Sequence, residues 1–70
     1  MITVNAPMVG KILEVPTHVG QKIREDETVI VMEAMKMEIP IVAPADGTIK
    51  EIKVTPGQMV EADEVLAVME

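Results

Sequence analysis

Apolar residues occur along the chain in short runs that alternate with polar residues and are interrupted by proline or glycine. Residues 10–15 and 47–52 both follow the pattern Gly-x-Ile-x-x-Val/Ile, while residues 28–33 and 65–70 form longer apolar runs. Short runs of this kind, bounded by turn residues, favour β-strands. No segment keeps a helical period over three turns, because proline or glycine recurs too often. The pattern therefore predicts an all-β protein.

The same order of apolar runs and turn residues occurs twice in the chain. Shifting the chain by 37 residues places residues 4–33 on residues 41–70 without a gap, and 12 of the 30 pairs are identical. The turns at residues 19–20 and 56–57 correspond, and the second has the Pro-Gly order that favours a type II turn. The identical pairs are Ala6/Ala43, Pro7/Pro44, Gly10/Gly47, Ile12/Ile49, Glu14/Glu51, Gly20/Gly57, Gln21/Gln58, Asp26/Asp63, Glu27/Glu64, Val31/Val68, Met32/Met69 and Glu33/Glu70. Such a match indicates an internal structural repeat.

Neither half is large enough to bury its own apolar face. Two halves facing each other about a pseudo-twofold axis solve this problem, so we expect residues 1–70 to form a single domain. The predicted fold is a flattened β-barrel or sandwich of about eight short antiparallel strands in two sheets, a barrel-sandwich hybrid. Its core consists of Val, Ile, Leu, Ala and some of the seven Met, because the chain has no Phe, Tyr or Trp.

Residues 34–40 lie outside the repeat and join the halves as a hairpin. The equivalent position in the symmetry is the gap between the two chain ends. We therefore expect the termini to lie together at one end of the barrel and the hairpin at the other.

The composition excludes several functions. The chain has no Ser, Cys or Tyr and a single His, His18, for which we expect an ordinary surface position, so serine and cysteine nucleophiles and a zinc site are excluded. A net charge of −6 with scattered basic residues argues against nucleic acid. No apolar run approaches the length of about 20 residues that spans a bilayer, and no signal peptide is evident. We expect a cytoplasmic, non-catalytic protein.

The joining hairpin contains the sequence Glu33-Ala34-Met35-Lys36-Met37-Glu38. A lysine in a turn is commonly just solvated, yet a hairpin tip also presents an amine on a rigid support. Alternation along a strand would place Met35 and Met37 on one face, opposite Lys36 and partly exposed. Exposure is unusual for Met and favours recognition by another protein over simple packing. For Glu33 and Glu38 we expect a solvated pair, with contacts to a modifying enzyme as the alternative.

Ala-Met-Lys-Met between two matched β halves resembles the attachment motif of biotinyl domains, the biotin carboxyl carriers of the biotin/lipoyl family. The resemblance covers essentially the whole chain. It implies that a biotin protein ligase joins biotin to Lys36 by an amide bond, with Ala34, Met35 and Met37 completing the motif. The chain would then carry carboxybiotin between a biotin carboxylase and a carboxyltransferase or decarboxylase. The ungapped repeat leaves no room for the protruding thumb loop that some of these domains carry.

Two other functions stay open. Lipoyl domains resemble this chain in architecture, but their motif usually has Asp before the lysine and Ala after it, where this chain has Met35 and Met37. An unmodified β module that only mediates protein contacts is the other alternative. The sequence does not identify the carboxyl acceptor or distinguish a stand-alone carrier from a domain of a longer enzyme.

Overall fold

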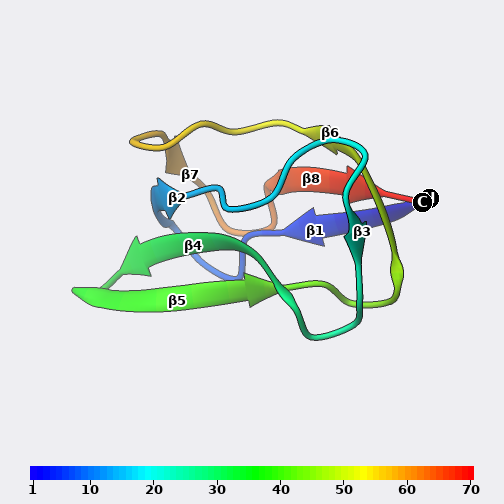
Figure 1. The fold of residues 1–70 in the computed structure, drawn as a ribbon. Coiled ribbons are helices and arrows are strands. Elements are labelled where there is room, and N and C mark those ends of the chain that lie inside the picture. Colours follow the sequence, from blue (N-terminus) through cyan, green and yellow to red (C-terminus); the bar gives the residue numbers. More distant parts are fainter.

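The computed structural model describes residues 1–70, and all of its regular elements are β-strands (Figure 1). The strands pair in two four-stranded antiparallel sheets with the orders β1-β8-β6-β3 and β5-β4-β2-β7. This confirms the predicted all-β fold of about eight short strands in two sheets. The strands are β1 (Ile2–Asn5), β2 (Gly10–Glu14), β3 (Lys22–Ile23), β4 (Thr28–Ala34), β5 (Met37–Val42), β6 (Gly47–Ile52), β7 (Met59–Val60) and β8 (Val65–Met69). None of the elements is a helix of the length and apolar content needed to cross a membrane.

The shift of 37 residues relates the strands as well as the sequence. It carries β1 onto the last four residues of β5, β2 onto the first five of β6, β3 onto β7, and the first five residues of β4 onto β8. The same exchange converts the strand order of one sheet into that of the other. Each sheet therefore takes two strands from each half of the chain, so neither half completes a sheet by itself.

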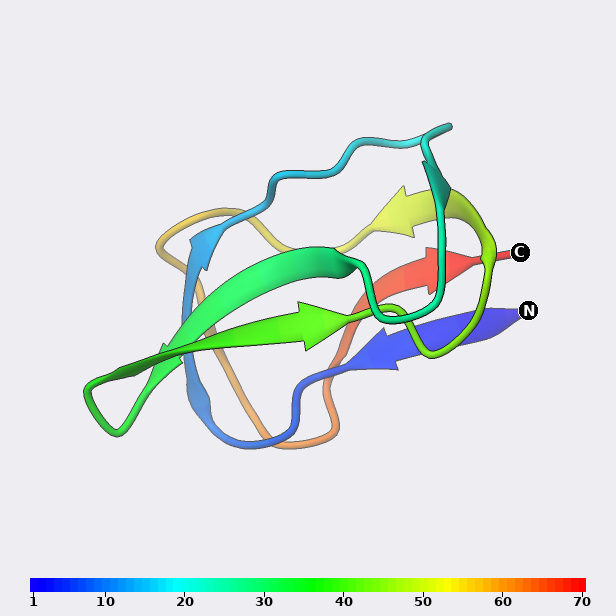
Figure 2. The same ribbon diagram turned by 60° about the horizontal axis from the view of Figure 1, so that its bottom comes forward.

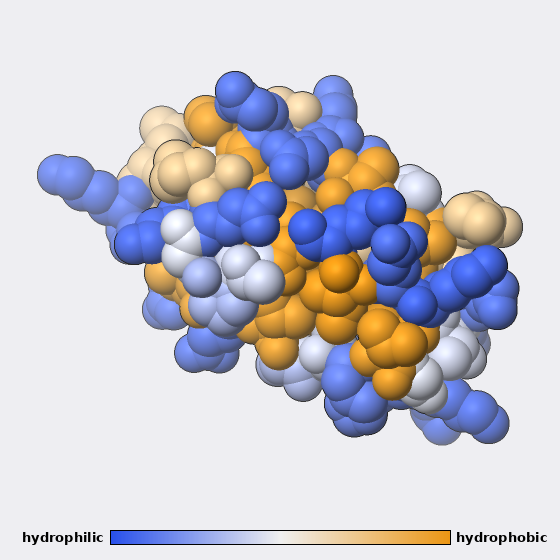
Figure 3. All heavy atoms as spheres, turned by 90° about the horizontal axis from the view of Figure 1, so that it is seen from above, coloured by the Kyte–Doolittle hydropathy of each residue, from blue (hydrophilic) through white to orange (hydrophobic).

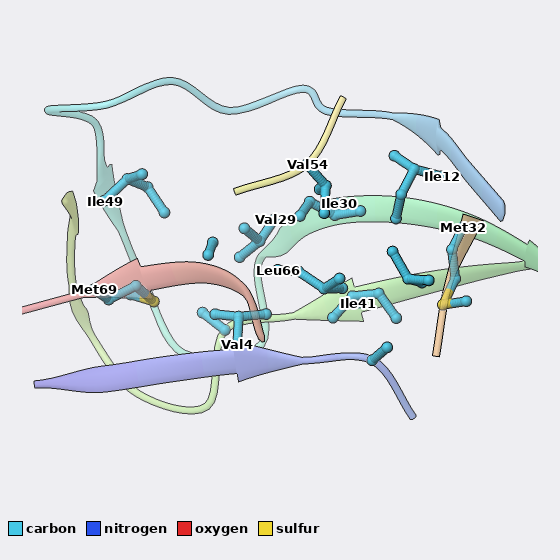
Figure 4. Close-up of a cluster of buried hydrophobic side chains, with 14 of the residues drawn as sticks. Val4, Ile12, Val29, Ile30, Met32, Ile41, Ile49, Val54, Leu66 and Met69 are labelled. Carbon is cyan, nitrogen blue, oxygen red and sulfur yellow. The ribbon is translucent and has the colours of Figure 1, made fainter. Parts of the chain in front are cut away.

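The core lies between the two sheets and follows the same symmetry (Figure 4). Met32 and Met69 are fully buried near its opposite ends, where an unbranched side chain fills the narrowing space. The predicted core composition is thus confirmed. Buried pairs related by the repeat are Val4/Ile41, Ala6/Ala43, Ile12/Ile49, Ile23/Val60, Val29/Leu66, Ile30/Ala67 and Met32/Met69.

Several residues that are identical in both halves form turns. Gly20 and Gly57 have φ of +93° and +92°, which glycine adopts without strain. In each turn the backbone N–H of the following Gln donates to the carbonyl three residues earlier, at 3.1 and 3.2 Å, as the predicted type II geometry requires. The Glu27 and Glu64 carboxylates accept from the backbone N–H of Arg24 and Glu61, at 2.7 and 2.9 Å.

The chain ends and the β4–β5 hairpin lie at opposite ends of the domain, as predicted (Figures 1 and 2). Ile2 pairs with Met69, which holds the two termini side by side. The domain measures 30 × 19 × 19 Å.

Candidate functional site

The joining hairpin has a two-residue turn. Glu33 pairs with Glu38 and Ala34 with Met37, so Met35 and Lys36 alone connect β4 to β5. Both have positive φ, 52° for Met35 and 65° for Lys36. Positive φ at both central residues is the requirement of a type I′ turn, whose twist matches that of the flanking strands.

Met and Lys are poor residues for this backbone. Type I′ turns favour Asn-Gly, because a side chain with Cβ costs about 1–2 kcal/mol in the left-handed region. Such strain persists where the surrounding structure imposes it, and it clusters at functional sites. The residue types at the tip are therefore not those that the turn itself would favour.

Ala34 anchors the base of the hairpin. Its side chain is buried, and it lies where β4 passes close to Gly10 of β2. A Cβ placed on Gly10 would lie 3.3 Å from the Ala34 Cβ and 2.5 Å from the Glu33 carbonyl oxygen. Small residues at both positions are needed for this close approach of the strands. The turn thus rests on a tightly packed base.

The tip residues are exposed, as predicted for the two methionines. The exposed fraction is 84% for Met35 and 65% for Met37, and Lys36 is exposed as well. The expectation that both methionines share one face through strand alternation was wrong in its premise, because Met35 lies in the turn and has a left-handed backbone. Met37 does belong to β5, two residues before Ile39, and is exposed because the strand extends beyond the core.

Glu33 and Glu38 lie directly opposite each other on the two strands, and both are exposed. Lys11 on β2 is in turn opposite Glu33. Neither glutamate forms an ion pair with Lys36, since the two ion pairs of the structure join Lys50 to Glu70 and Lys53 to Glu51. Their placement agrees with a solvated pair.

A shallow hollow of about 360 Å³ lies beside the turn. We call it the tip hollow. Its apolar walls include Val9 and Met59, which are 57% and 64% exposed. The sequence analysis missed these two residues, although the repeat pairs them with the charged residues Asp46 and Lys22. The complete lining is Val9, Gly10, Lys11, Glu33, Ala34, Met35, Lys36 and Met59.

These features define what the site can do chemically. It offers a primary amine at a rigid, projecting tip with exposed apolar side chains around it. An amine held in this way is suited to being acylated by another protein. Apolar surface is also exposed between charged side chains on the face shown in Figure 3.

Comparison with curated proteins gives a decarboxylase subunit and a biotinylated protein among the relatives of this chain. The gamma subunit of methylmalonyl-CoA decarboxylase from Veillonella parvula is 51% identical over 41 residues, which cover 59% of this chain and 32% of the subunit. A homologue of the biotinylated protein TB7.3 from Mycolicibacterium smegmatis is 48% identical over 40 residues, covering 57% of this chain and 56% of the relative. The matched part of this chain thus spans less than two-thirds of either relative.

Solved structures show the same fold. Part of the urea carboxylase from Kluyveromyces lactis matches with a TM-score of 0.92 and 29% identity, over 97% of this chain and 6% of that one. The lipoyl domain of the 2-oxoglutarate dehydrogenase complex from Azotobacter vinelandii matches with a TM-score of 0.83 and 26% identity, over 100% of this chain and 96% of that one.

The family model described as "Biotin-requiring enzyme" matches residues 2–69, from β1 to β8. That span includes both halves of the repeat and the hairpin between them. The chain therefore belongs to the biotin/lipoyl attachment family, as a biotinyl domain.

Proposed function

We propose that Lys36 carries biotin in amide linkage and that the domain delivers carboxyl groups between the active sites of a biotin-dependent enzyme. The observation that supports this most directly is the position of Lys36. It lies in the two-residue turn of the hairpin that projects opposite the chain termini. Any connection made through those termini leaves the tip free to enter an active site.

The chain's own residues supply an accessible nucleophile and a firmly packed support for the hairpin that carries it. The Lys36 ε-amine loses a proton and forms an amide bond to the carboxyl carbon of biotin. The bond from that carbon to a phosphate ester breaks in the same step, and a separate biotin protein ligase makes this activated ester from biotin and ATP. Met35 and Met37 offer the ligase an apolar surface on both sides of the amine, since both are largely exposed. Packing of Ala34 against β2 keeps the turn from moving away during the encounter.

When bound, biotin supplies a ureido nitrogen that accepts and releases a carboxyl group. The protein supplies the reach. The extended lysine stem and valeryl chain together span on the order of 14 Å, from bond lengths near 1.5 Å. A rigid domain with such an arm can serve a biotin carboxylase and then a carboxyltransferase or decarboxylase as partners. Relatives named as decarboxylase gamma subunits support partners of this class.

A lipoyl group on Lys36 is the second candidate, and the likeness to the Azotobacter vinelandii lipoyl domain favours it. The residues beside the lysine argue against it, because Met35 and Met37 match the biotinyl motif. Curated relatives named as biotinylated proteins add to the case for biotin.

Intact-mass measurement on protein produced with an active biotin protein ligase tests the proposal. We expect one biotin-sized increment that peptide mapping assigns to Lys36. Lys36→Arg should abolish it, and Lys50→Arg, which changes an exposed strand lysine, should leave it intact. A lipoyl-sized increment in the native host would favour acyl transfer instead. No increment despite an active ligase would favour an unmodified interaction module.

A further inference from the structure

The tip hollow has a counterpart at the other end of the domain. This second hollow, which we call the terminal hollow, is bounded by the start of β6 and by β3. The repeat relates four wall positions of the two hollows: Val9 to Asp46, Gly10 to Gly47, Lys11 to Thr48, and Met59 to Lys22. The two sites share a backbone framework but differ in their side chains.

The difference concerns the exposed walls. Val9 and Met59 present apolar surface to solvent in the tip hollow. At the equivalent positions of the terminal hollow, Asp46 and Lys22 are charged and exposed. The fold therefore accepts charged residues at these positions, so packing does not require the apolar ones. Val9, Met59 and Met35 are exposed together in one hollow, and a contiguous apolar patch of this kind is a candidate binding surface.

We propose that the tip hollow holds the bicyclic ring of the biotin attached to Lys36, folded back against its own carrier. The inference rests on the proposed function. Lys36 itself lines the hollow, so a group on its amine is tethered at the rim. The volume of about 360 Å³ lies within the usual range of small-molecule sites, roughly 300–1,000 Å³.

The lining matches the ring chemically. Val9, Met59 and the Met35 side chain provide apolar contact for the thiophane ring. Charged groups of both signs, from Lys11 and Glu33, also line the hollow. An ammonium group can donate to the ureido oxygen, and a carboxylate can accept from the ureido N–H groups.

Because the ring is tethered to Lys36, a weak interaction is sufficient to hold it in the hollow. Attachment at Lys36 makes the contact intramolecular, with an effective concentration in the millimolar range for a short flexible tether. The open shape of the hollow allows the ring to leave again for a partner's active site. An arm on the order of 14 Å long folds back easily on a domain 19 Å wide.

The test uses the full chain, biotinylated and verified by intact mass, with ¹³C-methyl labels on Met and Val. We expect the Met59 and Val9 methyl resonances to shift on biotinylation and to show nuclear Overhauser contacts with ring protons. Met59→Lys introduces the residue of the terminal hollow and should abolish the ring contacts of Val9, and Val9→Asp should likewise abolish those of Met59. Val42→Asn is the matched control: it replaces another exposed valine, outside the hollow, by its repeat equivalent, Asn5.

Streptavidin capture gives a second readout. If the ring occupies the hollow about half of the time, Met59→Lys raises the capture rate about twofold, and Val42→Asn does not change it. Biotinylated wild type without methyl shifts or ring contacts would overturn this inference and leave the proposed function intact. Slower biotinylation of Met59→Lys, with no ring contacts in wild type, would also overturn this inference and leave the proposed function intact. The hollow would then be a surface that the ligase recognises. Absence of biotin on Lys36 would refute the proposed function itself.

Discussion

Replacing Met35 by Asn should make the unmodified domain more stable. Met35 occupies a left-handed backbone conformation in the turn, with φ of 52°, and its side chain is 84% exposed. Asn tolerates this conformation better than Met does. The substitution relieves strain without removing a buried contact.

The size of the effect follows from two terms. A residue with Cβ pays about 1–2 kcal/mol in the left-handed region, and Asn recovers part of that cost. Little burial is lost, because Met35 is already mostly in solvent. We expect a gain of about 0.5–1 kcal/mol in the free energy of unfolding. For a domain of this size, 1 kcal/mol corresponds to about 4–8 °C in Tm.

Urea denaturation followed by far-UV circular dichroism, or scanning calorimetry, measures this gain. Intrinsic fluorescence is not an option because the chain has no Trp or Tyr. Met37→Asn is the control, since Met37 belongs to β5 and Asn is unfavourable in strands. A stability of Met35→Asn equal to or below that of wild type would refute the strain argument. Slower modification by the ligase together with higher stability would show that the turn residues serve recognition at the expense of stability.

Three further substitutions test the packing, all by urea denaturation. Gly10→Ala should destabilise the domain by about 1–3 kcal/mol through overpacking, because the new Cβ would meet the Glu33 carbonyl at 2.5 Å. Gly47→Ala should cost less, because its nearest neighbour, the Glu70 carbonyl at 2.9 Å, is at the chain end; equal losses would contradict this reading. Thr17→Val should cost about 0.5–1.5 kcal/mol by removing the 3.0 Å hydrogen bond from Thr17 Oγ1 to the Val29 carbonyl. Its repeat equivalent, Val54, is buried in the same way, so unchanged stability would mean that the hydrogen bond contributes nothing.

The repeat explains why most of the fold could be predicted from the sequence. Identity between the halves is concentrated where backbone conformation is demanding, as at Gly20/Gly57, or where side chains are fully buried, as at Ile12/Ile49. Two aligned copies make such positions visible without further information. The separation of the termini from the hairpin followed from the same symmetry.

The first strand of each half could not be predicted in the same way, and neither could the type and register of the hairpin turn. Pro40 is unfavourable within a strand, yet it is accommodated in β5 because β5 is an edge strand of its sheet. The pair Met35-Lys36 gives no turn signal, so neither the register of the hairpin nor the positive φ values could be read from residue types. The Lys36 motif located the tip, whereas its left-handed backbone became evident only in the structure.

The tip hollow was missed for a different reason. Val9 and Met59 are 50 residues apart in the chain and come together only because β2 pairs with β7. Val9 directly precedes β2 and Met59 is the first residue of β7, and neither differs by itself from other apolar residues of the chain. The sequence shows that both residues are apolar where their repeat equivalents are charged. This difference points to a binding surface only once both residues are known to be exposed.

The pairing of β1 with β8 repeats that of β5 with β4: Ile2 faces Met69 as Ile39 faces Met32. The barrel therefore has two equivalent ends, and the peptide chain is continuous across only one of them. A circular permutant that links Glu70 to Met1 by a short turn and opens the chain between Met35 and Lys36 should keep every strand in its place. In such a molecule, a copy of the hairpin sequence in the new link would place the exposed lysine at the opposite end of the domain, so chain connectivity alone decides which end presents it.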